Sequence, residues 1–325
     1  MKYKNIGILG GSGFVGQHLA SLLLQHGYKV SILSRNPKNH PTTSLLIGAN
    51  IQAGDVFDNH SLESFCEGLD CLINLVGILN EKEDNGKEFH HVHVDLAHLT
   101  AQACETKQVP RLLHMSALCA DADKGSSYYL RSKGEAEDWA QHASEWGLDV
   151  TTFRPSVIFG PDDHFLNRFA SLLKLTPLAF PLACPDSRFA PVYIGDVCQA
   201  FLNALQDPAS IGQRYDLCGP KTYTLQQLVE YTVSCLGIKR EVVGLPDVLS
   251  RLQAKVLGMV PGKPFSMDNY RSLQTDSICL TDGLSALGIK PTALEAIAPR
   301  YLANDSRSGQ LNHYRHKIPY PCKKP

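Results

Sequence analysis

Apolar residues along the chain fall into short runs that alternate with helical repeats. Residues 6–9 form a first run with the length of a buried parallel strand, and apolar residues then recur at helical intervals over 15–23. Further runs of strand length follow at 29–34, 49–53, 71–76, 111–116 and 148–153. This alternation predicts an α/β fold with a doubly wound parallel sheet over residues 1–160.

The second half of the chain has a more mixed pattern. Helices are expected at 165–173, 196–205 and 224–236, and a strand with a glycine stop at 215–219. We expect residues 161–302 to form mainly a smaller mixed α/β C-terminal lobe, with segments at about 190–220 returning to the first domain. Residues 303–325 lose periodicity and are rich in Lys, Arg and His. They predict a flexible basic tail, or an arm docked on a partner.

Residues 246–257 carry an apolar stripe at helical spacing. Such a stripe is typical of a helix packed on its own domain. It also fits a helix that docks on a membrane surface or a partner protein. The sequence favours self-packing and leaves docking open.

Three glycines separate the first strand from the first helix. Gly10, Gly13 and Gly16 follow a Gly-x-x-Gly-x-x-Gly spacing, which in this position is the fingerprint of a dinucleotide-binding Rossmann domain. Gly10 permits a tight turn, Gly13 lets the backbone approach a pyrophosphate, and Gly16 lets helix and strand pack closely. The candidate cofactor-binding residues of this turn are Gly10, Ser12, Gly13, Phe14, Val15 and Gly16.

The end of the second strand indicates which dinucleotide is bound. Ser34 is followed there by Arg35. An acidic residue at this point holds the ribose 2′-hydroxyl of NAD(H), whereas an arginine accommodates a 2′-phosphate. The pair therefore favours NADP(H) over NAD(H), the alternative being a solvated arginine at a strand end.

Two further loops follow strands whose carboxyl ends should face the cofactor. Asp55 and Val56 follow the third strand, and Asp55 is expected to meet the adenine edge or else to cap the next turn. Leu75, Val76 and Gly77 end the fourth strand. All five are candidate cofactor-binding residues.

A candidate catalytic set follows the fifth strand. Ser116 ends that strand, and Tyr129 precedes Lys133 by four residues, so the two side chains share one helix face. A phenol with a pKa near about 10 is a poor base at neutral pH, but a nearby ammonium favours the phenolate. Ser116 would hydrogen-bond a substrate oxygen, Tyr129 would act as acid or base, and Lys133 would tune Tyr129 and bind the cofactor ribose.

Composition narrows the functional classes. The 325-residue chain has a formal net charge of −1, which gives no basic field for nucleic acid. Ten cysteines are scattered without a Cys-x-x-Cys pair, and no secretory signal is recognised, which together indicate reduced thiols and a cytoplasmic location. The longest apolar stretches are strand-sized, so no transmembrane segment is predicted.

Four histidines, His90, His91, His93 and His98, raise the question of a metal site. His91 and His98 would share a helix face with Asp95. No second cluster completes a ligand set, so no metal is predicted.

Taken together, these motifs resemble the extended short-chain dehydrogenase/reductase superfamily, of the NAD-dependent epimerase/dehydratase type. The segments that carry the resemblance are Gly10–Gly16, Gly54-Asp55, Ser116, Tyr129 with Lys133, Arg154–Pro161 and Pro191–Val197. Three further features are similar to the branch that contains the nucleotide-binding accessory subunit of respiratory complex I and its bacterial relatives. They are His114–Ala117 with Ser127–Lys133, Phe165–Phe169, and Pro261–Pro264 with Asp268-Asn269.

The resemblance implies a Rossmann domain, a small C-terminal lobe and bound NADP(H). It implies that Pro155 and Ser156 pass beside the nicotinamide, although they would equally suit a simple strand exit. Arg188 is expected to look into the substrate cleft and to pair with a phosphate or carboxylate, or else to be a surface arginine. One position departs from the pattern: His93 stands where many members carry asparagine. That departure affects a conventional proton relay and leaves cofactor binding untouched.

Functions from different classes stay open. The first is an oxidoreductase or nucleotide-sugar epimerase/dehydratase-type enzyme that uses NADP(H) on a small-molecule substrate. The second is a non-catalytic, cofactor-bearing accessory or assembly factor of respiratory complex I, peripheral at the inner face of the membrane. A redox sensor that changes partners is a third alternative, because fold and motif alone do not establish turnover.

Overall fold

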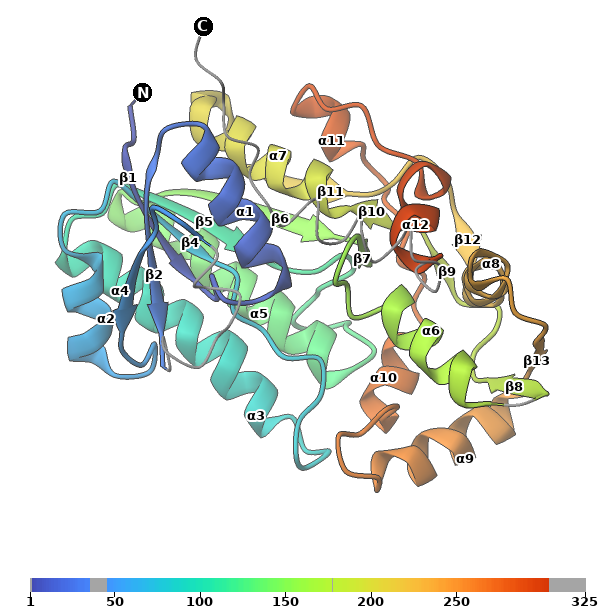
Figure 1. Cartoon of the computed structure of the whole chain (residues 1–325). Coiled ribbons are helices and arrows are strands. Elements are labelled where there is room, and N and C mark those ends of the chain that lie inside the picture. The colour runs from blue at the N-terminus through green and yellow to red at the C-terminus, as the bar shows by residue number, and fades with distance from the viewer. Residues whose placement is uncertain (1, 36–45, 177, 304–325) are drawn as a thin grey trace, which may run out of the picture.

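Seven parallel strands form the central sheet (Figure 1). The structure is a computed structural model that describes residues 2–35, 46–176 and 178–303. In spatial order the strands are β11 (Arg214–Leu217), β6 (Asp149–Pro155), β5 (Arg111–Met115), β4 (Cys71–Asn74), β1 (Asn5–Leu9), β2 (Lys29–Ser34) and β3 (Asn50–Ala53). The direction of winding reverses between β1 and β4, so the carboxyl ends of these two strands flank the crevice where such sheets bind ligands.

Helices cover both faces of this sheet. On one face lie α1 (Phe14–Gln25) and α7 (Ile194–Gln206), and on the other lie α2 (Asn59–Cys66), α4 (Leu96–Thr106) and α5 (Tyr128–His142). Successive residues of β1 point to opposite faces of the sheet. Ile8 packs into the apolar core under α1 and α7 (the first core), and Leu9 packs into the core under α2, α4 and α5 (the second core). Strands buried on both faces are mostly apolar, which is why they form near-continuous apolar runs in the sequence, although β5 and β6 also bury polar residues such as His114 and Thr152. The predicted doubly wound parallel sheet is confirmed.

A π-helical turn interrupts the helix that leads to β5. The helix begins as α3 (Lys87–His90), passes through the π turn (His91–Asp95) and continues as α4. Such turns change the angular position of the residues they contain and are frequent at functional sites. Here the turn leaves His91 exposed and buries His93.

The remaining elements build the smaller lobe and three short strand pairs. The helices are α6 (Leu166–Leu175), α8 (Leu225–Leu236), α9 (Asp247–Gly258), α10 (Met267–Ser272), α11 (Gly283–Ala286) and α12 (Leu294–Leu302), with 3₁₀ turns at Ala143–Trp146 and Pro208–Ser210. The pairs are β7 (Ile158–Phe159) with β10 (Val192–Tyr193), β8 (Ala179–Leu182) with β13 (Glu241–Gly244), and β9 (Arg188–Phe189) with β12 (Tyr223–Thr224). A third apolar core joins α6, α8 and α12. The mixed α/β lobe is confirmed, while the domain boundary at residue 160 stays a prediction.

The expected self-packing of the stripe at 246–257 is wrong. The helix forms as α9, but it buries Ser250 and Ala254 instead of the apolar stripe. Val248 is 76% exposed, Leu252 56% and Val256 53%. The stripe therefore faces away from its own lobe.

The expectation that all cysteines are reduced is also corrected. Cys218, just after β11, forms a disulfide with Cys279, which precedes α11. The other cysteines of the described segments are free. Within the same segments, no helix is long and apolar enough to cross a membrane. The expected basic tail lies, from residue 304 onward, outside the described residues.

Candidate functional site

The glycine turn between β1 and α1 has the geometry that its spacing predicts. Gly10 has a φ of +78°, a left-handed conformation that favours glycine. A Cβ on Gly16 would lie 2.4 Å from the carbonyl oxygen of Gly10, so only glycine lets α1 start this close to the strand. Gly13 is the N-cap of α1, and no side chain caps this end. The first turn of α1 thus offers backbone N–H groups and a partial positive charge.

Around this turn, Phe14 and Val15 are half-buried against the first core, Ser12 is half-buried, and Gly13 is exposed. Ser34 is buried at the end of β2, whereas Arg35 is exposed and has no ion pair with another residue of the described segments. An exposed cation at this strand end is free to meet an anionic group.

The Asp55 carboxylate accepts a hydrogen bond from the N–H of Phe57, at 3.1 Å. Asp55 therefore caps the turn, which is the alternative role given for it above. Its contact with the adenine edge stays a prediction. Val56 is half-buried against the second core.

The loop after β4 joins the glycine turn to the candidate catalytic residues. A Cβ on Gly10 would lie 3.1 Å from the carbonyl carbon of Leu75, so the two loops are in close contact. A Cβ on Gly77 would lie 3.0 Å from Nζ of Lys133 and 3.4 Å from Nε2 of His93. Gly77 therefore leaves room for both side chains at the carboxyl edge of the sheet.

Two hydrogen bonds hold Lys133 of α5 and Ser116 together at the end of β5. Nζ of Lys133 donates to the carbonyl of Met115 at 3.0 Å, and Oγ of Ser116 donates to the carbonyl of Lys133 at 3.4 Å. Both side chains are buried. Tyr129 is half-buried on the same helix, α5, with its ring centroid 5.7 Å from that of His93. Its hydroxyl has no hydrogen-bond partner among the described residues.

The pKa of Tyr129 shifts opposite to the direction expected from Lys133. Burial raises the pKa of Tyr129 to about 12. Burial also lowers the pKa of Lys133 to about 8, although the Glu137 carboxylate one turn further along α5 opposes that shift. Because each shift disfavours the charged form, desolvation dominates both groups.

His93, where many members of the resembled superfamily carry asparagine, forms a polar chain beside Tyr129. The N–H of Ile78 donates to its Nε2 at 3.1 Å, which assigns the ring proton to Nδ1. Nδ1 donates to Oγ of Ser132 at 2.8 Å, and that hydroxyl donates to the carbonyl of Tyr129 at 3.0 Å. Burial, with the Lys133 charge, lowers the pKa of His93 to about 2, so the ring is neutral.

His114 is a second buried histidine near Lys133 that sequence reasoning did not single out as a site residue. Burial and the Lys133 charge lower its pKa to about 3. Both of its ring nitrogens are buried without a hydrogen-bond partner among the described residues. The sequence feature that could have identified His114 as a site residue is its place on β5, two residues before Ser116.

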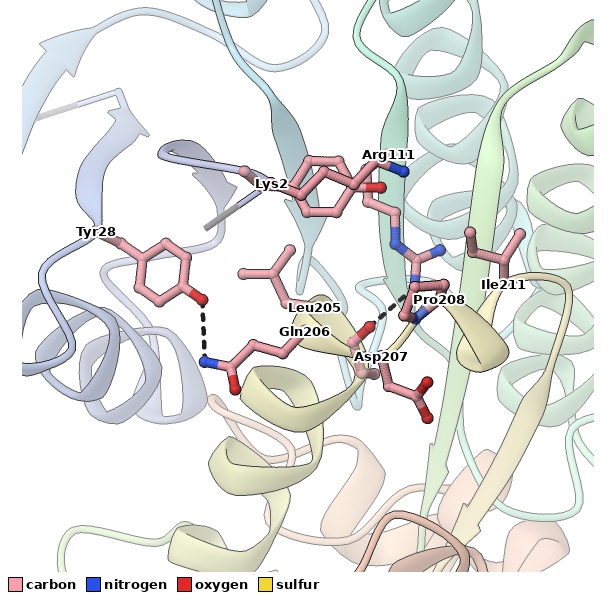
Figure 2. Close-up of a pocket in the computed structure, with 10 residues that line it drawn as sticks. Lys2, Tyr28, Arg111, Leu205, Gln206, Asp207, Pro208 and Ile211 are labelled. Carbon is pink, nitrogen blue, oxygen red and sulfur yellow. Dashed lines mark hydrogen bonds between the residues drawn. The ribbon is translucent and has the colours of Figure 1, made fainter.

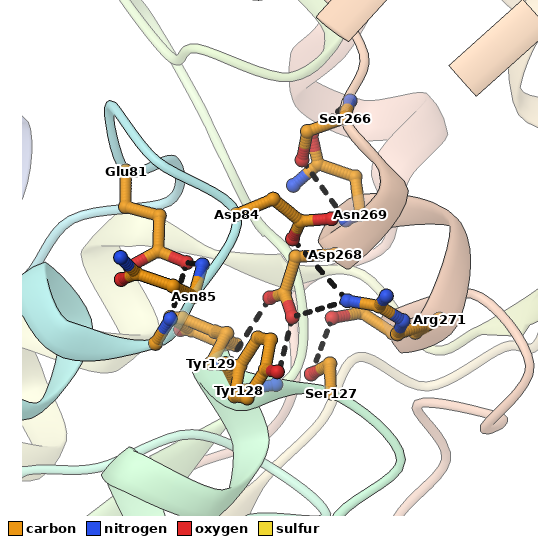
Figure 3. A network of polar contacts seen from close by, with 12 residues as sticks. Glu81, Asp84, Asn85, Ser127, Tyr128, Tyr129, Ser266, Asp268, Asn269 and Arg271 are labelled. Atoms are coloured by element: carbon orange, nitrogen blue, oxygen red, sulfur yellow. Dashed lines mark hydrogen bonds and ion pairs between the residues drawn. The ribbon is translucent and has the colours of Figure 1, made fainter. Parts of the chain in front are cut away.

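A carboxylate from the lobe caps the start of α5 (Figure 3). Asp268 of α10 is 2% exposed and accepts hydrogen bonds from the N–H groups of Tyr128 at 2.7 Å and Tyr129 at 3.1 Å. Burial raises the pKa of Asp268, and these two backbone bonds oppose the shift. Sequence reasoning noted Asp268 only for its resemblance, since nothing in the local pattern links it to a helix about 140 residues earlier.

Neighbouring contacts strengthen the same junction. Oγ of Ser272 donates to Oγ of Ser127 at 2.8 Å, and Nδ2 of Asn269 donates to the carbonyl of Leu79 at 3.0 Å. Arg271 pairs with Asp84 at 3.2 Å. The α10 segment therefore fixes both the start of α5 and the loop before α3.

Arg188 and Ser156 have partners within the chain. The Arg188 guanidinium lies 2.7 Å from the Asp276 carboxylate, and Asp276 also accepts from its backbone N–H at 3.0 Å. Oγ of Ser156 donates to the carbonyl of Ser277 at 2.9 Å, while Pro155 is the last residue of β6. The Arg188 charge is thus compensated by Asp276, and a substrate contact for it stays a prediction.

A cavity and the exposed histidines of residues 90–98 lie apart from the carboxyl edge of the sheet. A cavity of about 260 Å³, lined by Tyr28, Arg111 and Asp207 among others, lies at the opposite, amino end of β5 (Figure 2). Among the residues that the structure describes, no group of three or more His, Cys, Asp or Glu is placed to hold a metal ion. In the histidine cluster, Nδ1 of His91 lies 2.9 Å from the Asp95 carboxylate.

The fold and these residues define a protein class. Residues 6–218 match the NAD dependent epimerase/dehydratase family, and the chain belongs to that family. A solved structure with the same fold is DesIV, a dTDP-glucose 4,6-dehydratase from Streptomyces venezuelae with NAD and TYD bound. The two are 19% identical, with a TM-score of 0.73, over 96% of this chain and 98% of that chain.

Relatives identify the branch within the family. The chain is 30% identical over 297 residues to the mouse (Mus musculus) mitochondrial protein named NADH dehydrogenase [ubiquinone] 1 alpha subcomplex subunit 9, over 89% of this chain and 77% of the relative. It is 26% identical over 242 residues to a protein of Caulobacter vibrioides named ceramide reductase, over 74% of each chain. The predicted resemblance to the complex I branch is confirmed.

The described residues fit a nicotinamide dinucleotide, the cofactor that the family implies. A Cβ on Gly13 would meet only the carbonyl oxygen of Gly10 within 4 Å, so the approach to the first turn of α1 is open. The backbone at Gly13 and the N–H groups of the first turn of α1 would hold the pyrophosphate, and Lys133, beside Gly77, would meet the nicotinamide ribose.

The low pKa of Lys133 predicts a pH-dependent effect of Lys133→Met on stability. The folded-state pKa of about 8 lies below the ordinary value of 10.5, so at pH 7 folding buries a charged ammonium at a cost. Above pH 8 the folded protein releases that proton before the unfolded chain does, so wild-type stability rises with pH. Between pH 7 and pH 10, urea unfolding should show wild type gaining about 2 kcal/mol relative to Lys133→Met.

Lys124→Met is the matched control, because Lys124 is exposed on the loop before α5. Its difference from wild type should not change over this pH range. Parallel pH profiles for wild type and Lys133→Met would show that Lys133 is not desolvated as described.

Proposed function

We propose that the protein is an NADP(H)-dependent oxidoreductase that transfers hydride to or from a carbon bearing oxygen. The observation that carries this proposal is the convergence of Lys133 and Ser116 at the end of β5, directly beside Gly77. Tyr129 is on the same helix face as Lys133, four residues earlier. The family match and the relative named ceramide reductase support the same class of chemistry.

Each residue has a defined role in this proposal. A bound nicotinamide supplies or accepts the hydride. Tyr129, whose burial raises its pKa to about 12, keeps its proton at neutral pH and donates it to the substrate oxygen during reduction. Oγ of Ser116 hydrogen-bonds that oxygen as charge develops, and Lys133 holds the ribose and offsets negative charge on Tyr129. The neutral His93 fixes the start of α5 through Ser132.

Tyr129→Phe is expected to lower kcat by about 10²-fold or more, because proton donation then has no donor in this position. The measurement is NADPH oxidation with carbonyl compounds, after a screen finds a substrate. Tyr128→Phe is the matched control, since Tyr128 faces Arg131 and Arg271 instead of the site. Equal turnover by Tyr129→Phe and wild type would refute the role of Tyr129.

Arg35 provides the proposed preference for NADP(H). Arg35→Ala should weaken NADPH binding about tenfold or more, because it removes a charge-assisted contact to the 2′-phosphate, and should leave NADH binding within about twofold. Fluorescence titration of both cofactors measures this. Lys29→Ala removes an exposed charge at the other end of β2 and is the control. Equal affinities of wild type for the two cofactors would contradict the preference.

A second function is favoured by the relatives named as subunits of mitochondrial NADH dehydrogenase. Under this alternative the protein is a non-catalytic, cofactor-bearing accessory or assembly factor of respiratory complex I, peripheral at the inner face of the membrane. The 30% identity over 89% of the chain supports it.

Gentle solubilisation of native membranes, followed by separation of complexes by size, tests the accessory function. An accessory subunit should co-migrate with respiratory NADH dehydrogenase, and Tyr129→Phe should leave that co-migration unchanged because binding does not need the phenol proton. A species that never associates with the dehydrogenase would eliminate this alternative and favour the independent oxidoreductase.

A further inference from the structure

Helix α9 is amphipathic, but its apolar face is exposed and its opposite face is the one that packs on the lobe. The side chains that it buries are Ser250, 1% exposed, and Ala254, 0% exposed. The apolar side chains point outward: Val248 is 76% exposed, Leu252 56% and Val256 53%. A surface helix of a globular protein normally buries such a stripe, so this one is left for something outside the lobe.

Inward polar contacts fix this orientation. Oγ of Ser250 donates to the carbonyl of Leu245 at 3.2 Å and accepts from the N–H of Cys184 at 3.2 Å. The hydroxyl of Tyr270 donates to the Asp247 carboxylate, and Nε2 of Gln253 donates to the carbonyl of Pro181 at 3.1 Å. Rotating α9 to bury its stripe would break all of these bonds, so the apolar face is fixed outward.

The apolar surface extends beyond the helix. Met259, 81% exposed, and Val260, 42% exposed, continue the stripe past the end of α9. α9 runs along the outer margin of the lobe, next to the β8–β13 pair (Figure 1). Leu178, just before β8, is 82% exposed, and Val243 of β13 is 42% exposed.

Basic side chains accompany this surface. Arg251 and Lys255 are exposed between the apolar positions of α9. From residue 239 to residue 263 the sequence has five basic residues, Lys239, Arg240, Arg251, Lys255 and Lys263, against two acidic ones, Glu241 and Asp247. Asp247 is already bonded to Tyr270. The segment that carries the stripe therefore has an excess of positive charge, and Arg251 and Lys255 present part of it at the stripe itself.

We propose that α9 docks on a lipid bilayer with anionic headgroups and lies in the plane of its interface. An apolar helix face flanked by Lys and Arg is the recognised form of an interfacial membrane helix. Val248, Leu252, Val256 and Met259 enter the acyl boundary, while Arg251 and Lys255 reach the headgroups. A second copy of the chain fits less well, because a two-fold contact on this face would set the basic residues against one another.

The proposal does not rest on the function proposed above, and purified full-length protein tests it directly. Co-flotation with vesicles of phosphatidylcholine plus phosphatidylglycerol should exceed co-flotation with phosphatidylcholine alone and should fall as salt rises. Joint Leu252→Gln and Val256→Gln should lower binding about tenfold or more. Arg251→Gln and Lys255→Gln should each lower binding to the anionic vesicles about fivefold.

Ile47→Gln with Leu280→Gln is the matched control. These two side chains are 81% and 98% exposed but lie outside α9, so their loss should leave vesicle binding unchanged. Thermal unfolding of every variant checks that the fold is kept.

Three results would overturn the proposal. The first is no flotation of the wild type with anionic vesicles. The second is flotation that the α9 variants do not change, which would assign binding to another part of the chain, such as the basic residues after 303. The third is a wild-type dimer in light scattering that the Leu252→Gln and Val256→Gln variant dissociates, without vesicle binding, which would make the face a contact between copies.

Discussion

The arrangement of the site depends on where helix α5 begins. The first N–H groups of any helix lack intrahelical partners, and here the buried carboxylate of Asp268 accepts two of them, from Tyr128 and Tyr129. A capping contact of this kind contributes about 1 kcal/mol, and a carboxylate at a helix N-terminus reaches about 2 kcal/mol in partly buried sites. One end of α5 is therefore set by the lobe instead of by the sheet.

Further along α5, a second buried carboxylate attaches the helix to the sheet. Tyr129, Lys133 and Glu137 follow one another at four-residue spacing, so they share one face of α5. Glu137 is 1% exposed and lies 2.8 Å from Nε of Arg154 and 2.7 Å from Nε of Arg214. These arginines belong to β6 and β11, so the helix is also attached to the last two strands of the sheet. Tyr129 is part of the first attachment, and Lys133 lies between the two, one turn from each.

The sheet and the glycine turn could be predicted because both are local. Buried parallel strands are mostly apolar runs, and the spacing of Gly10, Gly13 and Gly16 reflects a tight turn and the close packing of α1 on the strand. The pairing of Asp268 with α5, and of Cys218 with Cys279, joins residues far apart in sequence, so no local pattern contains it. The reversed polarity of α9 was missed for a different reason. Periodicity shows that a helix has an apolar face, but only the tertiary contacts of Ser250 show which way that face points.

The distance along the chain between Asp268 and α5 also matters during synthesis. Translation proceeds from the N-terminus, so all seven sheet strands and the whole glycine turn are synthesised before Asp268. Through that interval the N–H groups of Tyr128 and Tyr129 must rely on water. The nascent chain thus acquires its nucleotide cradle first, and the helix that carries Tyr129 and Lys133 is anchored only when most of the lobe has been added.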